Sequence, residues 1–416
     1  MSALRHGFIL APVLGILWVF VIATSTAVAM SFSTGLAFRP SGVGVVIWGI
    51  AMGLSCTRWG GAALPSMHFG HFSRRSAGVA VSVLVILASW AGLGPVLAAA
   101  DVSVILVLLA AAAVAGFGTL GLWIMLEDVN ITALDRHAFE AAIIKFLTGF
   151  GYIFFAAIVL IPFYVMVLTS LKNQSELLLN PLDFSIDLSK GWQIFRSYEE
   201  LFTQFNFGVY LLNSFVISVL TVFITLLFAV PGAYAVARLR FRGRAAFSRS
   251  ILLIYMVPMI VLALPIYIAF SMTGLRNSLF GIILIYPVTT IPVALYMLQG
   301  YFRGLPAEVE EAGLMDGLPR LRVIWQITLP LSLPAMASVS LYVFMIAWNE
   351  FLLAFMLLDD PSTFTLTRGI ASLNSSEIPR QHLMAGSVIA TVPIMALFLG
   401  LERFMTRGLT AGSVKG

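Results

Sequence analysis

The sequence predicts an all-α, multi-pass membrane protein with about ten transmembrane helices. Of its 416 residues, 60% are hydrophobic and 10% are charged, and the mean hydropathy is +0.99. Soluble domains carry about 25% charged residues, so most of the surface of this chain cannot face water. Apolar runs of about 20 residues, long enough to cross a hydrocarbon core as helices, recur along the chain.

The apolar runs fall into an early group of four and a later group of six. The early spans are predicted at residues 8–30, 41–59, 77–94 and 102–126. The later spans are predicted at residues 149–170, 209–237, 251–271, 279–299, 333–357 and 384–402. A polar passage separates the groups, so we divide the chain into an N-terminal four-span extension (1–130), a cytoplasmic connector (131–148) and a six-span core (149–416).

Basic residues between the spans set the predicted orientation. The densest cluster, RLRFRGR at 238–244, places its loop in the cytoplasm under the positive-inside rule. Alternation from this loop places the polar segment 301–330 and both termini in the cytoplasm as well. The net charge of +5 is therefore assigned to membrane orientation and not to nucleic-acid binding.

The first span also has features of a secretory signal peptide, with Arg5 before a long apolar run and AVA at 27–29. Because this run exceeds the usual signal core of about 7–15 residues, we expect it to be retained. Cleavage would leave the predicted topology of the later spans unchanged.

Ionisable residues are rare within the predicted spans. Glu350, in WNEF at 348–351, lies well inside an apolar run, near the outer third of its span. Asn349 and Glu350 are compatible with two roles: they line the translocation pathway or its outer gate, or they hydrogen-bond a neighbouring helix. An ion-driven carrier generally needs intramembrane charges, so their scarcity counts against that class of protein.

The chain lacks the sequence patterns of a nucleotide site or a hydrolase. No lysine stands in the phosphate-binding pattern GxxxxGK[ST], and neither HExxH nor GxSxG occurs. His68 and His71 offer two metal ligands in a polar loop, which is fewer than a metal site requires. We therefore predict a protein that is not an enzyme, has no metal or cofactor of its own and takes its energy from a partner.

The segment 305–330, LPAEVEEAGLMDGLPRLRVIWQITLP, is a polar passage between two apolar runs. Pro306 predicts the start of a short helix, because proline is tolerated in a first turn. Three acidic residues lie near the positive end of the dipole of this helix: Glu308, Glu310 and Glu311. Gly317 is expected to supply a turn, and Pro319 to open a second helix that runs to Ile327. The predicted helix–turn–helix is suited to docking in a cleft of a soluble partner.

The spacing of residues in this segment resembles the EAA signature of ABC-importer permeases. Glu311-Ala312-Gly313 is followed after three residues by Gly317, and after nine more by Ile327-x-Leu329-Pro330. The second alanine of the family signature is Gly313 here, a departure that is expected to soften the helix end. Three further stretches resemble the maltose-type, carbohydrate-uptake branch of the family: residues 213–244, WNEFL at 348–352 and GLTAGSVKG at 408–416. The resemblance covers about residues 145–416.

The resemblance implies an ABC type I importer core in a multi-pass protein of the cell inner membrane. The chain would form half of a translocation pathway for sugars or oligosaccharides, and a glycerol-phosphate or polyol substrate is also compatible. Its partners would be a second homologous permease, two ATPase subunits that bind ATP and Mg, and an extracytoplasmic sugar-binding protein that faces the outer loop 358–383. The residues expected to couple the chain to its ATPase are Glu308, Glu310, Glu311, Ala312, Gly313, Asp316, Gly317, Ile327, Leu329 and Pro330.

Two other functions are compatible with the residues alone, namely an ion-coupled secondary carrier and a non-transporting membrane scaffold that recruits an ATPase. The extension 1–130 lies outside the resemblance, and its role is open. Small residues at 49–53 (GIAMG) and 110–118 (AAAAVAGFG) predict close helix packing, either within the chain or against another subunit.

Overall fold

The computed structural model describes residues 6–57, 74–99, 102–131, 134–180, 183 and 185–410. The side chains of residues 74, 75, 188, 252, 254, 255 and 401–410 are not described. His68, His71 and the end of the GLTAGSVKG stretch lie outside the described residues. The chain forms two compact units, one of residues 1–168 and 175–191 and the other of residues 169–174 and 192–416.

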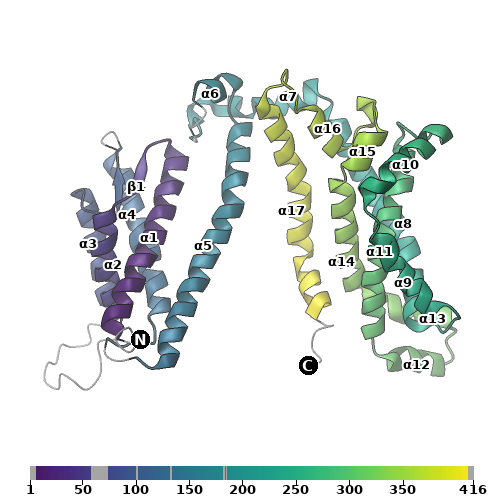
Figure 1. The fold of residues 1–416 in the computed structure, drawn as a ribbon, viewed down its shortest axis with the longest axis horizontal. Coiled ribbons are helices and arrows are strands. Elements are labelled where there is room, and N and C mark those ends of the chain that lie inside the picture. Colours follow the sequence, from purple (N-terminus) through teal and green to yellow (C-terminus); the bar gives the residue numbers. More distant parts are fainter. Residues whose placement is uncertain are drawn as a thin grey trace. The chain divides into compact units, whose positions relative to one another are not determined.

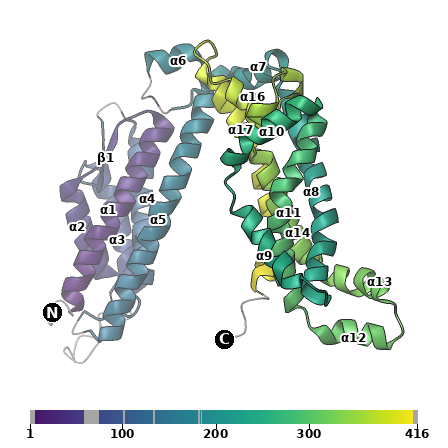
Figure 2. The ribbon, with the colours of Figure 1, turned by 45° about the vertical axis from the view of Figure 1, so that its right-hand side comes forward.

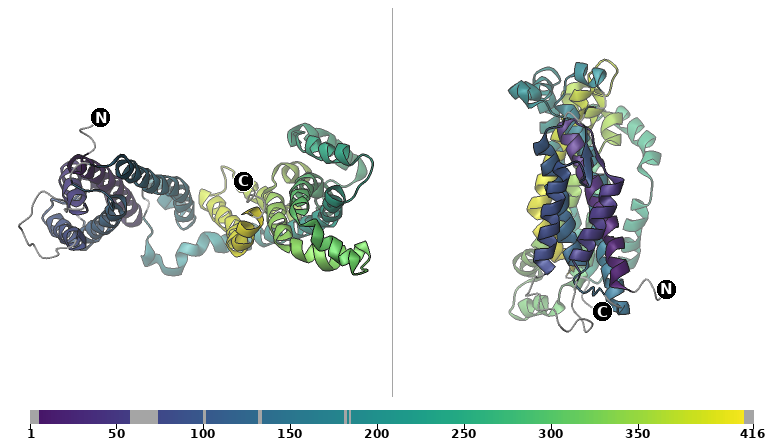
Figure 3. Two further views of the ribbon diagram at one scale, coloured as in Figure 1. Left: turned by 90° about the horizontal axis from the view of Figure 1, so that it is seen from below. Right: turned by 90° about the vertical axis from the view of Figure 1, so that its left-hand side faces the viewer.

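The first unit is built around four helices that lie side by side (Figures 1 and 3). These are α1 (Gly7–Thr34), α2 (Gly42–Ser55), α3 (Arg74–Trp90) and α4 (Val104–Met125). Two short strands, β1 (Phe38–Pro40) and β2 (Val96–Ala98), pair antiparallel with Arg39 opposite Leu97. The unit also contains most of α5 (Arg136–Ser170) and α6 (Gln174–Leu179), and the 3₁₀ helix η2 (Leu188–Phe195) begins in it.

Glycine residues allow α1 and α2 to approach closely. A Cβ atom on Gly15 would lie 2.1 Å from the carbonyl oxygen of Gly49, and one on Gly53 would lie 2.2 Å from that of Ala11. On α4, a Cβ atom on Gly118 would meet Met52. The small residues at 49–53 and at the end of 110–118 therefore serve packing within the first unit.

The second unit contains the remaining helices, which Figure 1 labels in chain order. Before the polar segment 305–330 lie α7 (Arg196–Gln204), α8 (Phe207–Arg238), α9 (Arg244–Tyr255), α10 (Met259–Thr273) and α11 (Leu279–Gly304). Within it lie α12 (Ala307–Met315), α13 (Arg320–Val323) and the π-helical η3 (Ile324–Thr328). Then come α14 (Leu329–Asn349), α15 (Leu352–Leu357), the 3₁₀ helix η4 (Pro361–Thr363), α16 (Leu366–Ser372) and α17 (Arg380–Thr410).

The apolar helices coincide with the predicted spans. Among the described residues, seven helices are long and apolar enough to cross a membrane. Three shorter apolar helices, Gly42–Ser55, Ser76–Trp90 and Met259–Thr273, fall on the other predicted spans. The predicted fold class, an all-α membrane protein with several spans, is confirmed.

Two predicted spans are interrupted, and one begins early. The span predicted at 251–271 is broken between α9 and α10, where Pro258 has no N–H to continue the helix and precedes α10 as its N-cap. The span predicted at 333–357 is broken after Asn349, because Glu350 takes an extended conformation. Helix α5 begins at Arg136, so much of the predicted connector is helical, and an ion pair of 2.6 Å joins Arg136 to Glu140 one turn later.

Candidate functional site

The segment between α11 and α14 projects from one end of the second unit as two short helices (Figure 2). Pro306 is the N-cap of α12, and Pro319 is the N-cap of α13. Between them, Gly317 has a φ of 82°, a left-handed conformation that favours glycine. The segment therefore reverses direction over a few residues between α12 and α13.

The second short helix continues into the membrane helix, so the prediction that it ends at Ile327 is wrong. Helix α13 passes through the π turn of η3 into α14, and the N–H of Leu329 reaches the carbonyl oxygen of Ile324, five residues earlier. Pro330 stands in the first turn of α14. The wide π turn accommodates the proline, which has no N–H to donate to the preceding turn.

Helix α12 has an exposed face and a covered face. Four exposed residues share one face at the spacing i, i+3, i+4, i+7: Glu308, Glu311, Ala312 and Met315. Met315 is 87% exposed. On the covered face, Gly313 is buried and packs closely against Ile327. A Cβ atom on Gly313 would lie 2.6 Å from Cδ1 of Ile327. The glycine that departs from the family signature thus makes room for Ile327.

Glu310 also points to the covered side, where its carboxylate meets three side chains. Tyr234 Oη donates to Oε2 of Glu310 over 3.2 Å, and Thr328 Oγ1 donates to Oε1 over 3.0 Å. Arg238 Nε lies 3.6 Å from the same Oε1, at ion-pair distance. The side chains of Arg238 and Glu310 are only 14% and 12% exposed. The charge of Glu310 is therefore satisfied inside the chain.

A second carboxylate, that of Glu350, is partly buried and lies at the other end of α14. Tyr286 Oη, which is buried on α11, donates to Oε2 of Glu350 over 2.7 Å. The backbone N–H of Leu353 donates to Oε1 over 2.8 Å and that of Ala354 to Oε2 over 3.1 Å, so the carboxylate caps α15. The neighbouring Asn349 is exposed, and its Nδ2 donates to the carbonyl oxygen of Met345.

Comparison with known proteins identifies the family to which these features belong. The family described as binding-protein-dependent transport system inner membrane component matches residues 229–410. The inner membrane ABC transporter permease protein YcjP of Escherichia coli (strain K12) is 37% identical over 270 residues, which are 64% of this chain and 95% of that protein. This chain belongs to that family. The trehalose/maltose transport system permease protein MalG of Thermococcus litoralis is 32% identical over 280 residues, 67% of the present permease and 99% of MalG.

A solved structure shows the same fold. The crystal structure of a bacterial ABC transporter involved in the import of the acidic polysaccharide alginate contains a chain that aligns with a TM-score of 0.54 and 24% identity. The alignment covers 65% of this permease and 98% of that chain. The predicted type I importer core with additional N-terminal helices is confirmed.

Sequence reasoning missed a polar cluster in the second unit of the permease. Asn277 has a φ of 53°, and its Oδ1 accepts hydrogen bonds from the backbone N–H groups of Asp359 and Asp360 over 3.0 and 2.9 Å. Arg276 Nη2 pairs with Oδ2 of Asp359 over 2.6 Å. These contacts tie the turn between α10 and α11 to the start of the loop 358–383. A left-handed asparagine after a glycine-ended helix is a common turn signal, but sequence alone does not reveal its distant partner.

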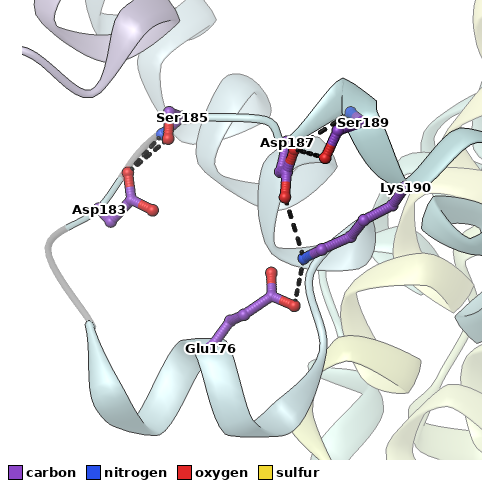
Figure 4. Close-up of polar contacts among 6 residues, drawn as sticks. All are labelled: Glu176, Asp183, Ser185, Asp187, Ser189 and Lys190. Atoms are coloured by element: carbon purple, nitrogen blue, oxygen red, sulfur yellow. Dashed lines mark hydrogen bonds and ion pairs between the residues drawn. The ribbon is translucent and has the colours of Figure 1, made fainter.

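A further polar cluster closes the segment that follows α6 in the first unit (Figure 4). Lys190 Nζ contacts the carboxylate of Glu176 and lies 3.9 Å from Oδ2 of Asp187. Two hydrogen bonds from Ser189 lower the pKa of the Asp187 carboxyl. Among the described residues, no group of three or more His, Cys, Asp or Glu side chains is arranged to hold a metal ion. The Lys190–Glu176 contact joins η2 to α6.

Proposed function

We propose that this permease is one membrane subunit of an ATP-driven importer of sugars or oligosaccharides. The description of its family, a component of binding-protein-dependent transport, supports a partnership with an extracytoplasmic binding protein. Relatives named for trehalose/maltose and for arabinooligosaccharide transport support a carbohydrate substrate. A second homologous permease would complete the pathway, and two ATPase subunits would bind ATP and Mg. Both termini and the segment 301–330 would lie in the cytoplasm.

The exposed face of α12 carries this proposal, because it offers a compact surface for the ATPase. Glu308 and Glu311 give the face a negative charge, and Ala312 and Met315 give it an apolar centre. A rigid helix that presents one apolar stripe with charges beside it suits insertion into a groove of a partner. Gly313, Gly317, Ile327, Leu329 and Pro330 would shape and support the segment, and Asp316 would extend its acidic rim.

Reversal of one charge on this face tests the docking role. Glu311→Lys should abolish capture of the ATPase subunit that co-purifies with the tagged wild-type permease from its native host. The loss of a complementary charge contact at an interface costs about 2–5 kcal/mol, which is enough to detach a partner. Glu377→Lys is the matched control, because Glu377 is an exposed acid in the loop 358–383. Equal capture by both variants at equal membrane abundance would refute the docking role of α12.

The end of α14 is the second part of the proposal. Asn349, exposed where α14 ends, would line the translocation pathway, and Glu350 would hold its outer gate by capping α15. Asn349→Ala should then change the rate of uptake of radiolabelled maltodextrin or trehalose in cells while ATPase capture stays at the wild-type level. Unchanged uptake of a sugar that the wild type transports would remove Asn349 from the pathway.

The division into an extension (1–130), a connector (131–148) and a core (149–416) is part of the same proposal. About two thirds of this chain aligns with almost the whole length of YcjP and of MalG. This coverage supports an extension that has no counterpart in those relatives. The glycine contacts of α1–α4 lie within their own unit, which supports an extension that packs as a unit of its own.

A further inference from the structure

The side chain of Glu310 points in a different direction from those of the other two glutamates of α12. Glu308 and Glu311 are exposed, whereas the side chain of Glu310 is turned toward α8 and η3. It receives hydrogen bonds from Tyr234 of α8 and Thr328 of η3, and it lies at ion-pair distance from Arg238. Glu310 therefore touches α8 and, through Thr328, the π turn that leads into α14.

Arg238 extends this cluster to the remaining elements. It is the last residue of α8, and its Nη2 donates to the carbonyl oxygen of Leu305, directly after α11, over 2.5 Å. Arg320, the first residue of α13, interacts with the hydroxyl of Tyr234. One cluster thus connects α8, the end of α11, α12, α13 and η3.

Apolar packing between the same elements is incomplete. An apolar groove of about 620 Å³ separates α8 from α13, η3 and the start of α14. Leu226 and Val230 line it on one side, and Leu321 and Trp325 line it on the other. The polar contacts of Glu310 and Arg238, neither of which lines the groove, form a direct bridge between α8 and the projecting segment.

We propose that Glu310 and Arg238 form a clamp that makes α12 and the end of α8 move as one rigid body. This inference rests on the proposed function, because docking of an ATPase on the exposed face of α12 supplies the movement. Glu310 is then a positioning residue that passes the movement to α8 and α14, and Glu311 and Glu308 make the contact outside. A buried ion pair is suited to this role, because separating its members leaves an unpaired charge and is therefore strongly resisted.

A distance measurement between α12 and α8 tests the clamp. Cys56 is the only cysteine, so a Cys56→Ser chain can carry spin labels at Val309→Cys and Phe228→Cys, both of which replace exposed side chains outside the docking face of α12. The labelled permease is purified with its co-captured partners, and the distance distribution is recorded without nucleotide and with ATP, Mg and vanadate. Glu310→Gln removes the charge with little change in shape. Glu308→Gln is the matched control on the exposed face.

We expect one narrow distance in the reference chain and in Glu308→Gln, with the same mean in both nucleotide states. Glu310→Gln should lose that narrow distance and give a broad distribution in both states, while it still captures the ATPase. Tyr234→Phe removes one hydrogen bond and keeps the ion pair, so its distance distribution should have an intermediate width. This variant replaces Glu310→Gln in the test if Glu310→Gln does not fold. A narrow distribution in the folded variants, or a reference distance that shifts with nucleotide, would overturn the clamp.

The two hypotheses fail in different ways. If the wild-type permease captures no ATPase, the proposed docking function fails, and the nucleotide-free distributions still decide whether Glu310 holds α12 to α8. If capture is normal and Glu310→Gln leaves the distribution narrow, the clamp alone is refuted.

Discussion

A glutamate lies beside each end of α14, because Glu310 contacts the N-cap residue Thr328 and Glu350 is the C-cap. The two carboxylates are satisfied by different chemistry. Glu310 has a cation at ion-pair distance, Arg238, together with two hydroxyl donors. Glu350 receives its hydrogen bonds from the hydroxyl of Tyr286 and from two backbone N–H groups, and among the described residues no ion pair joins it to a cation. The first arrangement joins separate elements through an ion pair. The second caps the helix that begins beside it, and its side-chain link to α11 is the neutral hydroxyl of Tyr286.

This difference indicates which end can transmit movement and which end holds a local shape. An ion pair between elements resists their separation, because both members would lose a partner. A cap fixes the start of one helix and depends mainly on neutral donors nearby in the chain.

The largest effect is expected at Arg238. Arg238→Met would leave the Glu310 carboxylate buried without its cation, and the loss of one member of such a pair costs about 3–5 kcal/mol. Thermal unfolding of the purified permease in detergent should show a clear decrease in midpoint. Arg240→Met is the control, because Arg240 is exposed just beyond α8. Adding Glu310→Gln to Arg238→Met should recover part of the loss, and a failure to recover any would argue against the pairing.

An intermediate effect is expected at the other end. Tyr286→Phe removes the hydroxyl that donates to Glu350, and a hydrogen bond to a charged group contributes about 1.5–3 kcal/mol. The unfolding midpoint should therefore fall less than in Arg238→Met. Tyr296→Phe, at an exposed position of the same helix, is the matched control. A larger loss for Tyr286→Phe than for Arg238→Met would reverse the proposed contrast.

The smallest effect is expected at Gly313, where the sequence departs from the family signature. Gly313→Ala forces Cδ1 of Ile327 to move, which we expect to cost about 1 kcal/mol, in the range of mild overpacking. Ile327→Val removes that atom, so the double variant should be more stable than Gly313→Ala alone. Thermal unfolding of the two single variants and the double variant measures this. If the stability losses of the single variants simply add in the double variant, the two residues do not compete for the same space.

Much of the fold follows from the sequence, because a membrane span leaves a simple apolar signal. All the predicted spans coincide with apolar helices, including short ones such as α2. The breaks were harder to predict, since the extended conformation of Glu350 interrupts a run that remains apolar on both sides. The connector was predicted as separate from the fifth span because its residues are polar. A helix can continue through polar residues, however, and α5 already begins at Arg136.

The candidate site was less predictable in its details than in its position. The EAA-like spacing located the segment and its turn at Gly317. The sequence could not separate Glu310 from Glu308 and Glu311, because the direction of each side chain depends on where Tyr234, Arg238 and Thr328 come together. It also could not reveal that Gly313 accommodates Ile327, because this contact depends on the fold of η3.

Site-specific photocrosslinking tests directly whether the exposed face of α12 docks the ATPase. A benzophenone maleimide attached at Met315→Cys in the Cys56→Ser chain would report what lies beside this face in the membrane of the native host. Ser375→Cys is the control, because Ser375 is exposed in the loop 358–383, beyond α16 at the opposite end of the second unit from α12 (Figure 1). We predict that Met315→Cys gives an adduct with the ATPase subunit, identified by mass spectrometry, and that Ser375→Cys gives none. An ATPase adduct at Ser375→Cys, with none at Met315→Cys, would show that the ATPase docks elsewhere and not on α12.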